Sequence, residues 1–275
     1  MEMSSSFLES LRQKAMWVRQ ETLEIHKIAP ETRIASSLSD IEIFVVLYYG
    51  KILHVDSKNI RWEERDRFII SKGHGAISLY PILADLGFFN KEELKRVCQE
   101  GTFLGSIPDP VIPGFETVNG SLGHGLGVAC GMALALKRKE VDGKVFVLLG
   151  DGELYEGSVW EAIMFASHHR LDNIILIIDN NKISMLDYCK NILCLEHLEE
   201  KFNAFNWNVN TVNGHSIEDL YNMLNDLKKN TVKQPKVLIA DTTKGKGVPQ
   251  MEADSLCHIK SLKEEEIDKI IKELK

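Results

Sequence analysis

The chain has 275 residues, of which 44% are hydrophobic and 27% are charged, and its net charge is −7. This balance predicts one large domain with a sizeable core, and the lack of a basic excess argues against broad nucleic-acid binding. Because no apolar run is long enough for a membrane span and the first residues are polar, we expect a cytoplasmic protein without a membrane anchor. The five cysteines include no CxxC pair and are expected to be free thiols.

Helical patterns occur at several points along the chain. Apolar residues spaced three and four apart predict a helix over residues 5–27. Three further pairs, in which a small polar residue precedes an acid by three positions, are start signals for helices. These pairs are Ser39 and Glu42, Asn90 and Glu93, and Ser261 and Glu264. The last of them is expected to open a charged helix that runs to the end of the chain.

Short apolar runs alternate with these helices. Runs at residues 144–149, 173–178 and 236–240 predict buried parallel strands, and residues 68–71 and 208–212 are weaker strand candidates. The alternation predicts an α/β fold, with a single doubly wound domain over residues 1–275 and a mostly parallel sheet flanked by helices. Since ligands bind at the carboxyl ends of the strands in such sheets, the residues directly after each strand are the first candidates for a site.

An aspartate between two glycines, Gly150-Asp151-Gly152, follows the first of the three buried strands. The glycines allow backbone amides to approach a phosphate closely, and the helix that follows adds its N-terminal partial positive charge. The carboxylate of Asp151 is then free to hold a hard cation. Taken alone, such a turn is a weak signal, because most Gly-Asp-Gly sequences are simply turns.

A second polar turn, Asp179-Asn180-Asn181-Lys182-Ile183, follows the next buried strand. The interval between Asp151 and Asn181 holds one helix and one strand, which is the size of a crossover that brings neighbouring strand ends together. We therefore expect both side chains to face one pocket. Carboxylate, carboxamide and peptide oxygens are ligands suited to Mg²⁺ or Ca²⁺.

The two turns together resemble the thiamine-diphosphate signature, and further segments make the sequence similar to the transketolase family. The segments that carry the resemblance, in family order, are residues 71–74, 120–125, 150–153, 156–162 and 244–248. The resemblance covers nearly the whole chain. It implies a thiamine-diphosphate-binding fold, thiamine diphosphate and a divalent metal as cofactors, and transfer of a two-carbon ketol unit between sugars.

The resemblance also implies roles for individual residues. Asp151 and Asn181 are implied to ligate the metal through their side chains, and Ile183 through its carbonyl. His74 and His258 match two histidines near the diphosphate and the thiazolium and are the implied catalytic residues. The implied cofactor-binding residues are His74, Gly120, Leu122, Gly150, Asp151, Gly152, Glu153, Asn181, Ile183, Met185 and His258. Other histidines, namely His168, His169 and His215, are expected to be structural.

The sequence departs from the family on the side expected to face the substrate. Arg33 and Ser106 stand where the family has two histidines that face the substrate's hydroxyl groups, and Cys257 stands where tryptophan is frequent. The metal and diphosphate motifs are intact. Our hypothesis is that the cofactor is retained and that the substrate differs from ordinary pentose phosphates.

The resemblance further implies a partner. In transketolases a glutamate from a separate pyrimidine-binding domain activates the cofactor, whereas this chain ends at Lys275 after one α/β domain. We therefore expect a second polypeptide that carries the pyrimidine and C-terminal domains, in an α2β2 tetramer acting on sugars or sugar phosphates. Two alternatives stay open: a component of another thiamine-diphosphate enzyme, of the 2-oxo-acid dehydrogenase or decarboxylase type, and a non-catalytic cofactor-binding partner. A nucleotide-binding ATPase is disfavoured because the chain has no phosphate-loop motif.

Overall fold

The computed structural model describes residues 4–252 and 254–274. Its centre is a five-stranded parallel sheet in the order β1-β2-β3-β5-β4. The strands are β1 (Arg67–Ile70), β2 (Val145–Gly150), β3 (Ile174–Asn180), β4 (Asn208–Asn213) and β5 (Lys236–Asp241). All five predicted strands are confirmed. Uninterrupted apolar runs form the strands that are buried on both faces, namely β2, β3 and β5, whereas the edge strand β4 alternates polar and apolar residues and is partly exposed.

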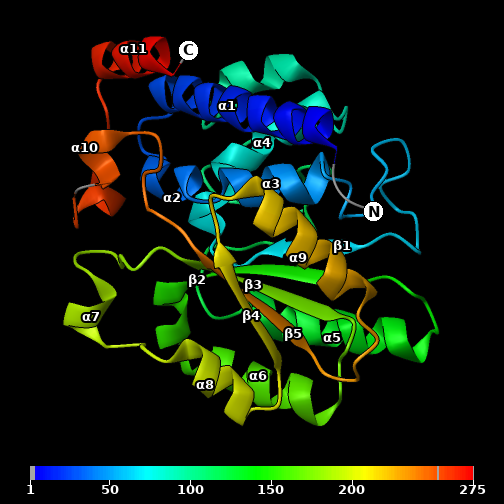
Figure 1. The fold of residues 1–275 in the computed structure, drawn as a ribbon. Helices are drawn as coiled ribbons and strands as arrows, with labels where there is room; N and C mark the ends of the chain where they lie inside the picture. Colours follow the sequence, from blue (N-terminus) through cyan, green and yellow to red (C-terminus); the bar gives the residue numbers. More distant parts are fainter. Residues whose placement is uncertain (1–3, 253, 275) are drawn as a thin grey trace.

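Helices cover both faces of the sheet (Figure 1). One face carries α1 (Ser5–Ile28), α2 (Ile34–Leu38), α3 (Ile41–Tyr48), α4 (Leu79–Asp85) and α9 (Ile217–Lys229). The other face carries α5 (Gly125–Arg138), α6 (Gly157–His168) and α8 (Leu198–Ala204). This arrangement confirms the predicted doubly wound α/β fold.

The remaining elements are short or lie at the margin of the sheet. They are α7 (Cys189–Ile192), α10 (Pro249–Glu252), α11 (Glu264–Glu273) and the 3₁₀ helices η1 (Gly73–Ser78), η2 (Lys91–Arg96), η3 (Asp151–Tyr155) and η4 (Cys257–Ile259). In Figure 1 the carboxyl ends of the strands point towards the side where α2, α7 and α10 lie. The polar turns after β1, β2, β3 and β5 therefore meet on that side.

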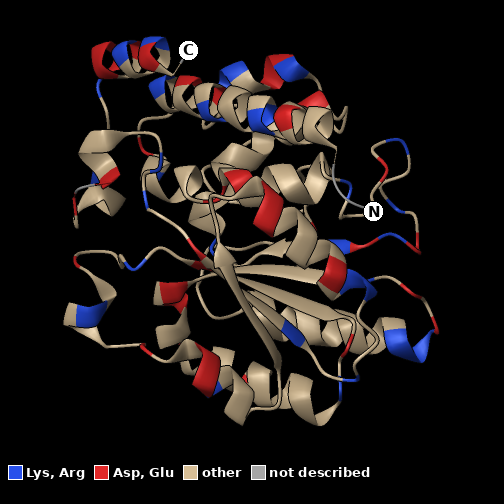
Figure 2. Ribbon diagram, in the orientation of Figure 1, with Lys and Arg blue, Asp and Glu red and all other residues tan. Residues whose placement is uncertain are grey.

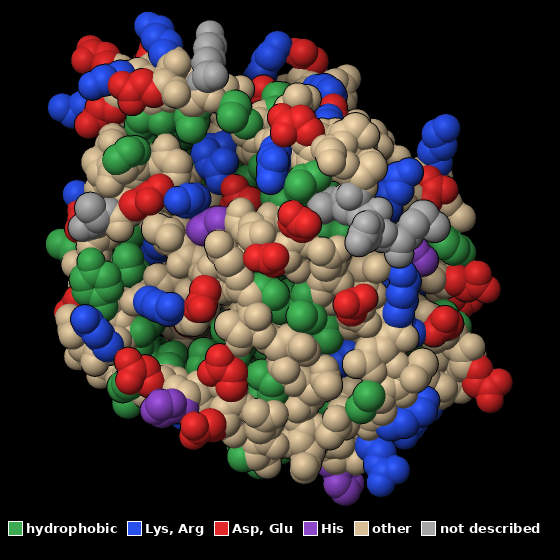
Figure 3. All heavy atoms as spheres, viewed as in Figure 1, with side chains coloured by type: hydrophobic (Ala, Val, Ile, Leu, Met, Phe, Trp, Pro, Cys, Tyr) green, Lys and Arg blue, Asp and Glu red, His purple; other side chains and the backbone are tan. Residues whose placement is uncertain are grey.

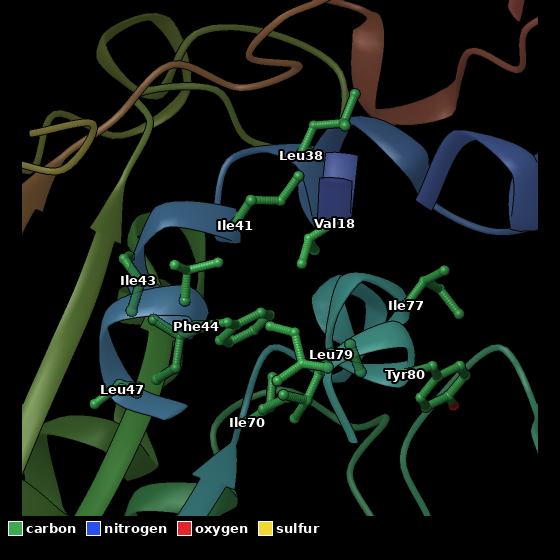
Figure 4. Close-up of a cluster of buried hydrophobic side chains, with 14 of the residues drawn as sticks. Val18, Leu38, Ile41, Ile43, Phe44, Leu47, Ile70, Ile77, Leu79 and Tyr80 are labelled. Carbon is green, nitrogen blue, oxygen red and sulfur yellow. The ribbon is translucent and has the colours of Figure 1, made fainter. Parts of the chain in front are cut away.

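Two apolar cores lie on either side of the sheet because successive strand residues face opposite ways. In β3, Ile175 and Ile177 pack beneath α1, α3 and α9, while Leu176 and Ile178 pack against α5, α6 and α8. Figure 4 shows part of the first core, where Phe44 of α3 points towards Leu79 of α4. This packing holds α2 and α3 against the carboxyl edge of the sheet.

Helices begin close to all three start signals, but only one of the predicted caps forms. Asn90 caps η2 as predicted, since its side chain accepts a hydrogen bond from the Glu92 amide at 3.0 Å, although η2 is a 3₁₀ helix. At α3 no capping box forms, because Ser39 Oγ instead donates to Asp179 Oδ2 at 2.8 Å and Glu42 pairs with Arg19. Burial gives these two side chains tertiary partners that outcompete the local ones.

The C-terminal helix also begins without its predicted cap. Ser261 lies outside α11, and its hydroxyl lies 3.1 Å from Nε2 of His26 on α1. The helix begins instead after Lys263, whose backbone amide donates to Glu266 Oε2 at 2.8 Å. Contact with α1 therefore decides where this helix starts.

Charged side chains lie mainly on helices and loops, while the sheet interior is nearly free of them (Figure 2). On the face drawn in Figure 3, acidic and basic side chains are interspersed. Within the described ranges, no helix combines the length and the apolar character that a membrane crossing requires. All five cysteines are free thiols, as predicted.

Candidate functional site

The two polar turns lie side by side at the carboxyl edge of the sheet. β2 and β3 are paired neighbours, and Gly150 is in register with Asp179. A hydrogen bond also joins the two turns directly: the Lys182 amide donates to Asp151 Oδ2 at 2.5 Å. The other oxygen of Asp151 accepts from the Gly152 amide at 2.7 Å. The structure thus brings together the residues of both predicted motifs.

Asp151 is buried, with 3% of its surface exposed. Burial raises the pKa of Asp151 to about 6, the charge of Asp179 adds to the effect, and Lys244 opposes it. Burial disfavours the charged form of a carboxylate, and a nearby cation stabilises that form. Asp151 is therefore suited to a divalent metal ion.

Asn181 is oriented by its neighbours. Its Nδ2 donates to Asp179 Oδ2 at 2.8 Å, and its Oδ1 accepts from the Ile183 amide at 3.2 Å. Because the nitrogen is committed to a carboxylate, the oxygen is the atom that can ligate a cation. Alternation along the chain explains the pairing: Asp179 and Asn181 share one face of the sheet, while Asn180 faces away and donates to Asp241 at 2.7 Å.

The oxygen donors at this site are sparse. They are one carboxylate, one carboxamide and the Ile183 carbonyl, and no group of three or more His, Cys, Asp or Glu in the described part of the chain could hold a metal. Such a set suits Mg²⁺, which usually takes its remaining ligands from water and from phosphate oxygens. The residues present therefore fit a metal bound together with a diphosphate.

A buried lysine supplies positive charge next to these donors. Lys244 Nζ donates to the Ile183 carbonyl at 2.7 Å, and the side chain is buried. Burial and the charge of Lys72 lower the pKa of Lys244, while Asp151 and Asp179 work in the opposite direction. An ammonium group held here can compensate the negative charge of a diphosphate. The sequence places Lys244 in a segment that resembles the family but predicts no role for it.

A buried ion network beneath the site was not predicted. Lys72 Nζ lies 2.9 Å from Asp40 Oδ2 and also contacts Asp179 Oδ2, and all three side chains are buried. Burial works against ionisation, yet Lys72 and hydrogen bonds from Thr242 and Asn181 hold the pKa of Asp179 below its usual range. The sequence offers one signal for this role of Lys72. The residue directly follows a candidate strand, as the Asp151 and Asn181 turns follow their own strands.

The two predicted catalytic histidines are adjacent. The rings of His74 in η1 and His258 in η4 have centroids 5.1 Å apart, and His258 Nδ1 lies 3.3 Å from Ser36 Oγ. Burial and the charge of Lys72 lower the pKa of His74. Burial, Lys244 and Arg33 lower the pKa of His258 to about 3. Both imidazoles are thus neutral near pH 7 and can donate or accept hydrogen bonds without adding charge.

A family model described as the transketolase thiamine diphosphate binding domain matches residues 32–275. The chain belongs to the transketolase family. Its relatives include one subunit of the apulose-4-phosphate transketolase of Phocaeicola vulgatus, which is 36% identical over 91% of this chain and 89% of the relative. One subunit of the 6-deoxy-6-sulfo-D-fructose transketolase of a Clostridium species is 37% identical over 93% of this chain and 92% of the relative.

Longer transketolases contain the same fold. The crystal structure of transketolase from Campylobacter jejuni matches with a TM-score of 0.89 at 31% identity, covering 99% of this chain and 43% of that one. Human transketolase is 35% identical over 97% of this chain and 42% of its own length. This chain thus spans less than half the length of these transketolases. The predicted family resemblance and fold are confirmed.

Other residues that the transketolase resemblance singled out lie around the same edge. Glu153 is buried, and its Oε1 accepts from the Gly123 amide at 2.9 Å and from Ser71, so it ties the 120–125 segment to β1. Gly120 faces Ile107, whose Cδ1 would lie 2.9 Å from an added Cβ. Leu122 is half-buried in the same segment. These residues shape the loop beside the Asp151 turn.

The motif glycines and Met185 complete the set. An added Cβ on Gly152 would lie 3.4 Å from Ser184 Oγ, so the two motif turns are in close contact there, and Gly150 lies opposite Lys72. Met185 is 58% exposed, which leaves its side chain available to pack on a bound ring.

The histidines expected to be structural lie apart from this cluster or serve as linkers. His215 Nδ1 is 3.0 Å from Glu42 Oε2, and its Nε2 accepts from the Thr243 amide at 2.7 Å, joining α3 to the loop after β5. His168 and His169 are exposed at the end of α6. The structural role of these three histidines stays a prediction.

Positions at which this chain departs from the transketolase pattern differ in exposure. Arg33 is exposed at the start of α2, and Ser106 is half-buried in the loop before the 120–125 segment. Cys257 is fully buried beside His258. Arg33 and Ser106 are therefore accessible to solvent, whereas Cys257 is not.

Proposed function

We propose that this chain is the thiamine-diphosphate- and Mg²⁺-binding subunit of an enzyme that transfers a two-carbon ketol unit between sugars. The observation that carries the proposal is the direct contact between the Gly150–Gly152 turn and the Asn181–Ile183 turn, next to a buried ammonium and two neutral imidazoles. Membership of the transketolase family supports the same reaction.

The residues have distinct tasks in this proposal. Asp151, Asn181 and the Ile183 carbonyl hold the metal, and the Gly152 amide and Lys244 compensate the diphosphate. When bound, thiamine diphosphate supplies a nucleophilic carbon and an electron sink for cleavage of a carbon–carbon bond.

The two histidines orient the sugar in this proposal. His74 and His258, which are neutral, hold sugar hydroxyl groups by hydrogen bonds and exchange protons with them. The half-exposed Met185 packs on the bound cofactor and keeps water from it.

A second polypeptide completes the proposed enzyme. Relatives that cover most of this chain are themselves named as single subunits of transketolases, which supports a separate partner. We assign to that partner the pyrimidine-binding domain and the activating glutamate, in an α2β2 assembly. The free cysteines are consistent with a reducing cytoplasm.

The substrate is proposed to be a ketose that bears an anionic group. Two relatives are named for apulose 4-phosphate and for 6-deoxy-6-sulfo-D-fructose, which carry a phosphate and a sulfonate. The replacement of two family histidines by Arg33 and Ser106 supports a donor other than an ordinary pentose phosphate.

Calorimetric titration of thiamine diphosphate with Mg²⁺, into this chain by itself and mixed with its partner, tests the proposal. We expect tight, metal-dependent binding in the mixture, abolished in Asp151→Ala. Asp142→Ala is the matched control, because Asp142 is an exposed acid at the opposite edge of the sheet and its loss should leave binding unchanged. Absence of binding in an assembled mixture would favour the non-catalytic alternative.

An activity screen separates the remaining alternative. Ketose donors with an aldose acceptor should be turned over, whereas 2-oxo acids with an electron acceptor should not. Turnover of the 2-oxo acids alone would assign this chain to the dehydrogenase or decarboxylase class instead.

A further inference from the structure

A buried polar network lies behind the loop that carries Lys244. It consists of Arg19 on α1, Glu42 on α3 and His215 in the turn between β4 and α9. Arg19 pairs with Glu42 Oε1 at 2.6 Å, and Glu42 Oε2 lies 3.0 Å from His215 Nδ1. All three side chains are at most 13% exposed. None of them belongs to the proposed metal, diphosphate or sugar contacts, so the proposed function leaves them without a task.

The two ends of the network hold the backbone of the loop after β5. The Thr243 amide donates to His215 Nε2 at 2.7 Å. Arg19 Nε donates to the Lys246 carbonyl at 3.1 Å. The loop also lies close to the Arg19 side chain, because a Cβ added on Gly247 would come within 2.5 Å of Arg19 Cδ. The loop is thus held on either side of its buried lysine.

The bond from Thr243 also decides which nitrogen of His215 carries the proton. A backbone amide can only donate, so Nε2 must accept and the ring proton lies on Nδ1, from which it is donated to Glu42. Burial works against ionisation of Glu42, yet Arg19 and His215 hold its pKa below its usual range. Each step between the guanidinium and the loop therefore pairs one donor with one acceptor.

Lys244 is the functional side chain whose place depends on this loop. Its ammonium reaches the Ile183 carbonyl at 2.7 Å and is buried beside the proposed metal donors. A lysine ammonium stands on a flexible four-carbon stem, so its location depends on where the backbone is held. A buried ion pair is weak evidence for stability, because the cost of desolvation offsets the attraction between the charges. Geometry at the site is the task that remains for the network.

We propose that the network of Arg19, Glu42 and His215 positions Lys244 against the diphosphate of bound thiamine diphosphate. The three residues act through Lys244 and touch neither the cofactor nor the sugar. This inference rests on the proposed function and adds positioning residues to the same site.

The first test compares two replacements of His215 that each keep one end of its contacts. In His215→Asn the carboxamide lies where Nδ1 lay and can still donate to Glu42, but it cannot reach Thr243. In His215→Gln the carboxamide is one carbon further out and can offer its oxygen to the Thr243 amide. Cofactor affinity is expected to follow the contact with Thr243 and not the contact with Glu42.

Titration of thiamine diphosphate with Mg²⁺ into the assembled two-component complex measures this difference. In His215→Asn we expect Kd to rise about 10-fold, the lower end of the range for residues that orient the ligands of a metal site. In His215→Gln it should stay within about threefold of the unaltered complex, because the bond to the loop is kept. Equal losses in the two variants would overturn the proposal.

A double-mutant cycle tests whether His215 acts through Lys244. Lys244→Met should raise Kd about 10- to 100-fold, the size expected for a charge-assisted contact. Once the ammonium is gone, adding His215→Asn should raise Kd by less than about threefold more, because residues that act through one contact are not additive. Additive losses would show that His215 works independently of Lys244 and would refute the assignment.

His26 offers a matched control. Its ring is buried, and its Nε2 also accepts from a backbone amide, that of Leu262 at 3.3 Å. His26→Asn removes the same kind of bond where α1 meets α11, which carries none of the proposed cofactor donors. Kd for thiamine diphosphate should therefore change less than about threefold. A loss as large as that in His215→Asn would mean that general stability, and not positioning, is responsible.

Hydrogen exchange measures the hold on the loop without any cofactor. Peptides that cover residues 242–248 should exchange faster in His215→Asn than in the unaltered chain, and at the unaltered rate in His215→Gln and His26→Asn. Unchanged exchange in His215→Asn would contradict this inference even if the cofactor binds as proposed. Failure of the unaltered complex to bind thiamine diphosphate would instead refute the proposed function, and exchange would still decide whether the network holds the loop.

Discussion

At the scale of single residues, one carboxylate controls the direction in which a predicted metal ligand points. Asp179 Oδ2 accepts from the Asn181 carboxamide nitrogen at 2.8 Å, and this bond leaves the Asn181 oxygen as the atom that can ligate a cation. Residues that orient metal ligands typically contribute 10- to 100-fold to metal affinity, so Asp179→Asn should weaken Mg²⁺ binding by about this factor. Titration of Mg²⁺, or of Mn²⁺ as a spectroscopic substitute, into the complex with thiamine diphosphate measures the change.

The chain offers a matched control for Asp179. Asp241, on the neighbouring strand, bonds Asn180 in the same way that Asp179 bonds Asn181, but on the opposite face of the sheet. Asp241→Asn should leave Mg²⁺ affinity nearly unchanged. Equal losses in the two variants would mean that Asp179 acts only through general stability.

At the scale of elements, helix α5 begins at a position that admits only glycine. A Cβ on Gly125 would lie 2.5 Å from Ser71 Cβ and 3.0 Å from Ser71 Cα, so Gly125→Ala must push α5 away from the end of β1. Overpacking of this kind costs about 1 to 3 kcal/mol. Gly131 lies in the same helix with open space around it, and Gly131→Ala should stabilise by about 0.5 to 1 kcal/mol. Urea unfolding of both variants tests the opposite signs.

The joint between α1 and α11 depends on one buried histidine. His26 Nε2 accepts from the Leu262 amide, and its Nδ1 lies 2.8 Å from Thr32 Oγ1. Burial lowers the pKa of His26 to about 4. Because the unfolded chain takes up this proton near pH 6.5 and the folded chain does not, this stabilisation is present above pH 6.5 and is lost as the pH falls towards 4.

The corresponding loss in unfolding free energy is on the order of 3 kcal/mol between pH 6.5 and 4. Urea unfolding at several pH values should show this slope, and His26→Asn should flatten it. His197→Asn, at an exposed position, should retain the slope. A slope unchanged in His26→Asn would show that other groups govern the acid sensitivity.

At the scale of the whole molecule, the Lys72 network joins distant parts of the chain. It links Lys72, two residues after β1, to the start of α3 and to β3, and Thr242 after β5 bonds the same Asp179. Removing one member of a buried ion pair leaves an uncompensated charge, so Lys72→Met should cost about 3 to 5 kcal/mol of stability. Thermal and urea unfolding measure the loss.

Two further variants accompany Lys72→Met, one as a rescue and one as a control. Asp40→Asn combined with Lys72→Met removes one of the two stranded carboxylates and should recover part of the stability. Lys91→Met breaks the exposed ion pair with Asp85 and should change stability by less than about 1 kcal/mol. If Lys72→Met behaves like Lys91→Met, the network is not a stabilising element.

The fold class and the donors expected for metal and diphosphate could be predicted from the order of residues. Unbroken apolar runs predicted three of the strands, residues 68–71 and 208–212 were weaker strand candidates, and the crossover length predicted that the turns at Asp151 and Asn181 would meet. These features are local in sequence or follow from parallel-sheet geometry, so they can be deduced without coordinates.

The partners of the buried polar side chains could not be predicted in this way and emerged with the folded structure. Ser39 and Ser261 have the pattern of helix caps, yet each has a partner from a distant element. The pairing of Lys72 with Asp40 and Asp179 is equally invisible in the sequence. Because burial makes an unmet hydrogen bond or charge costly, these partners are chosen by three-dimensional proximity rather than by spacing along the chain.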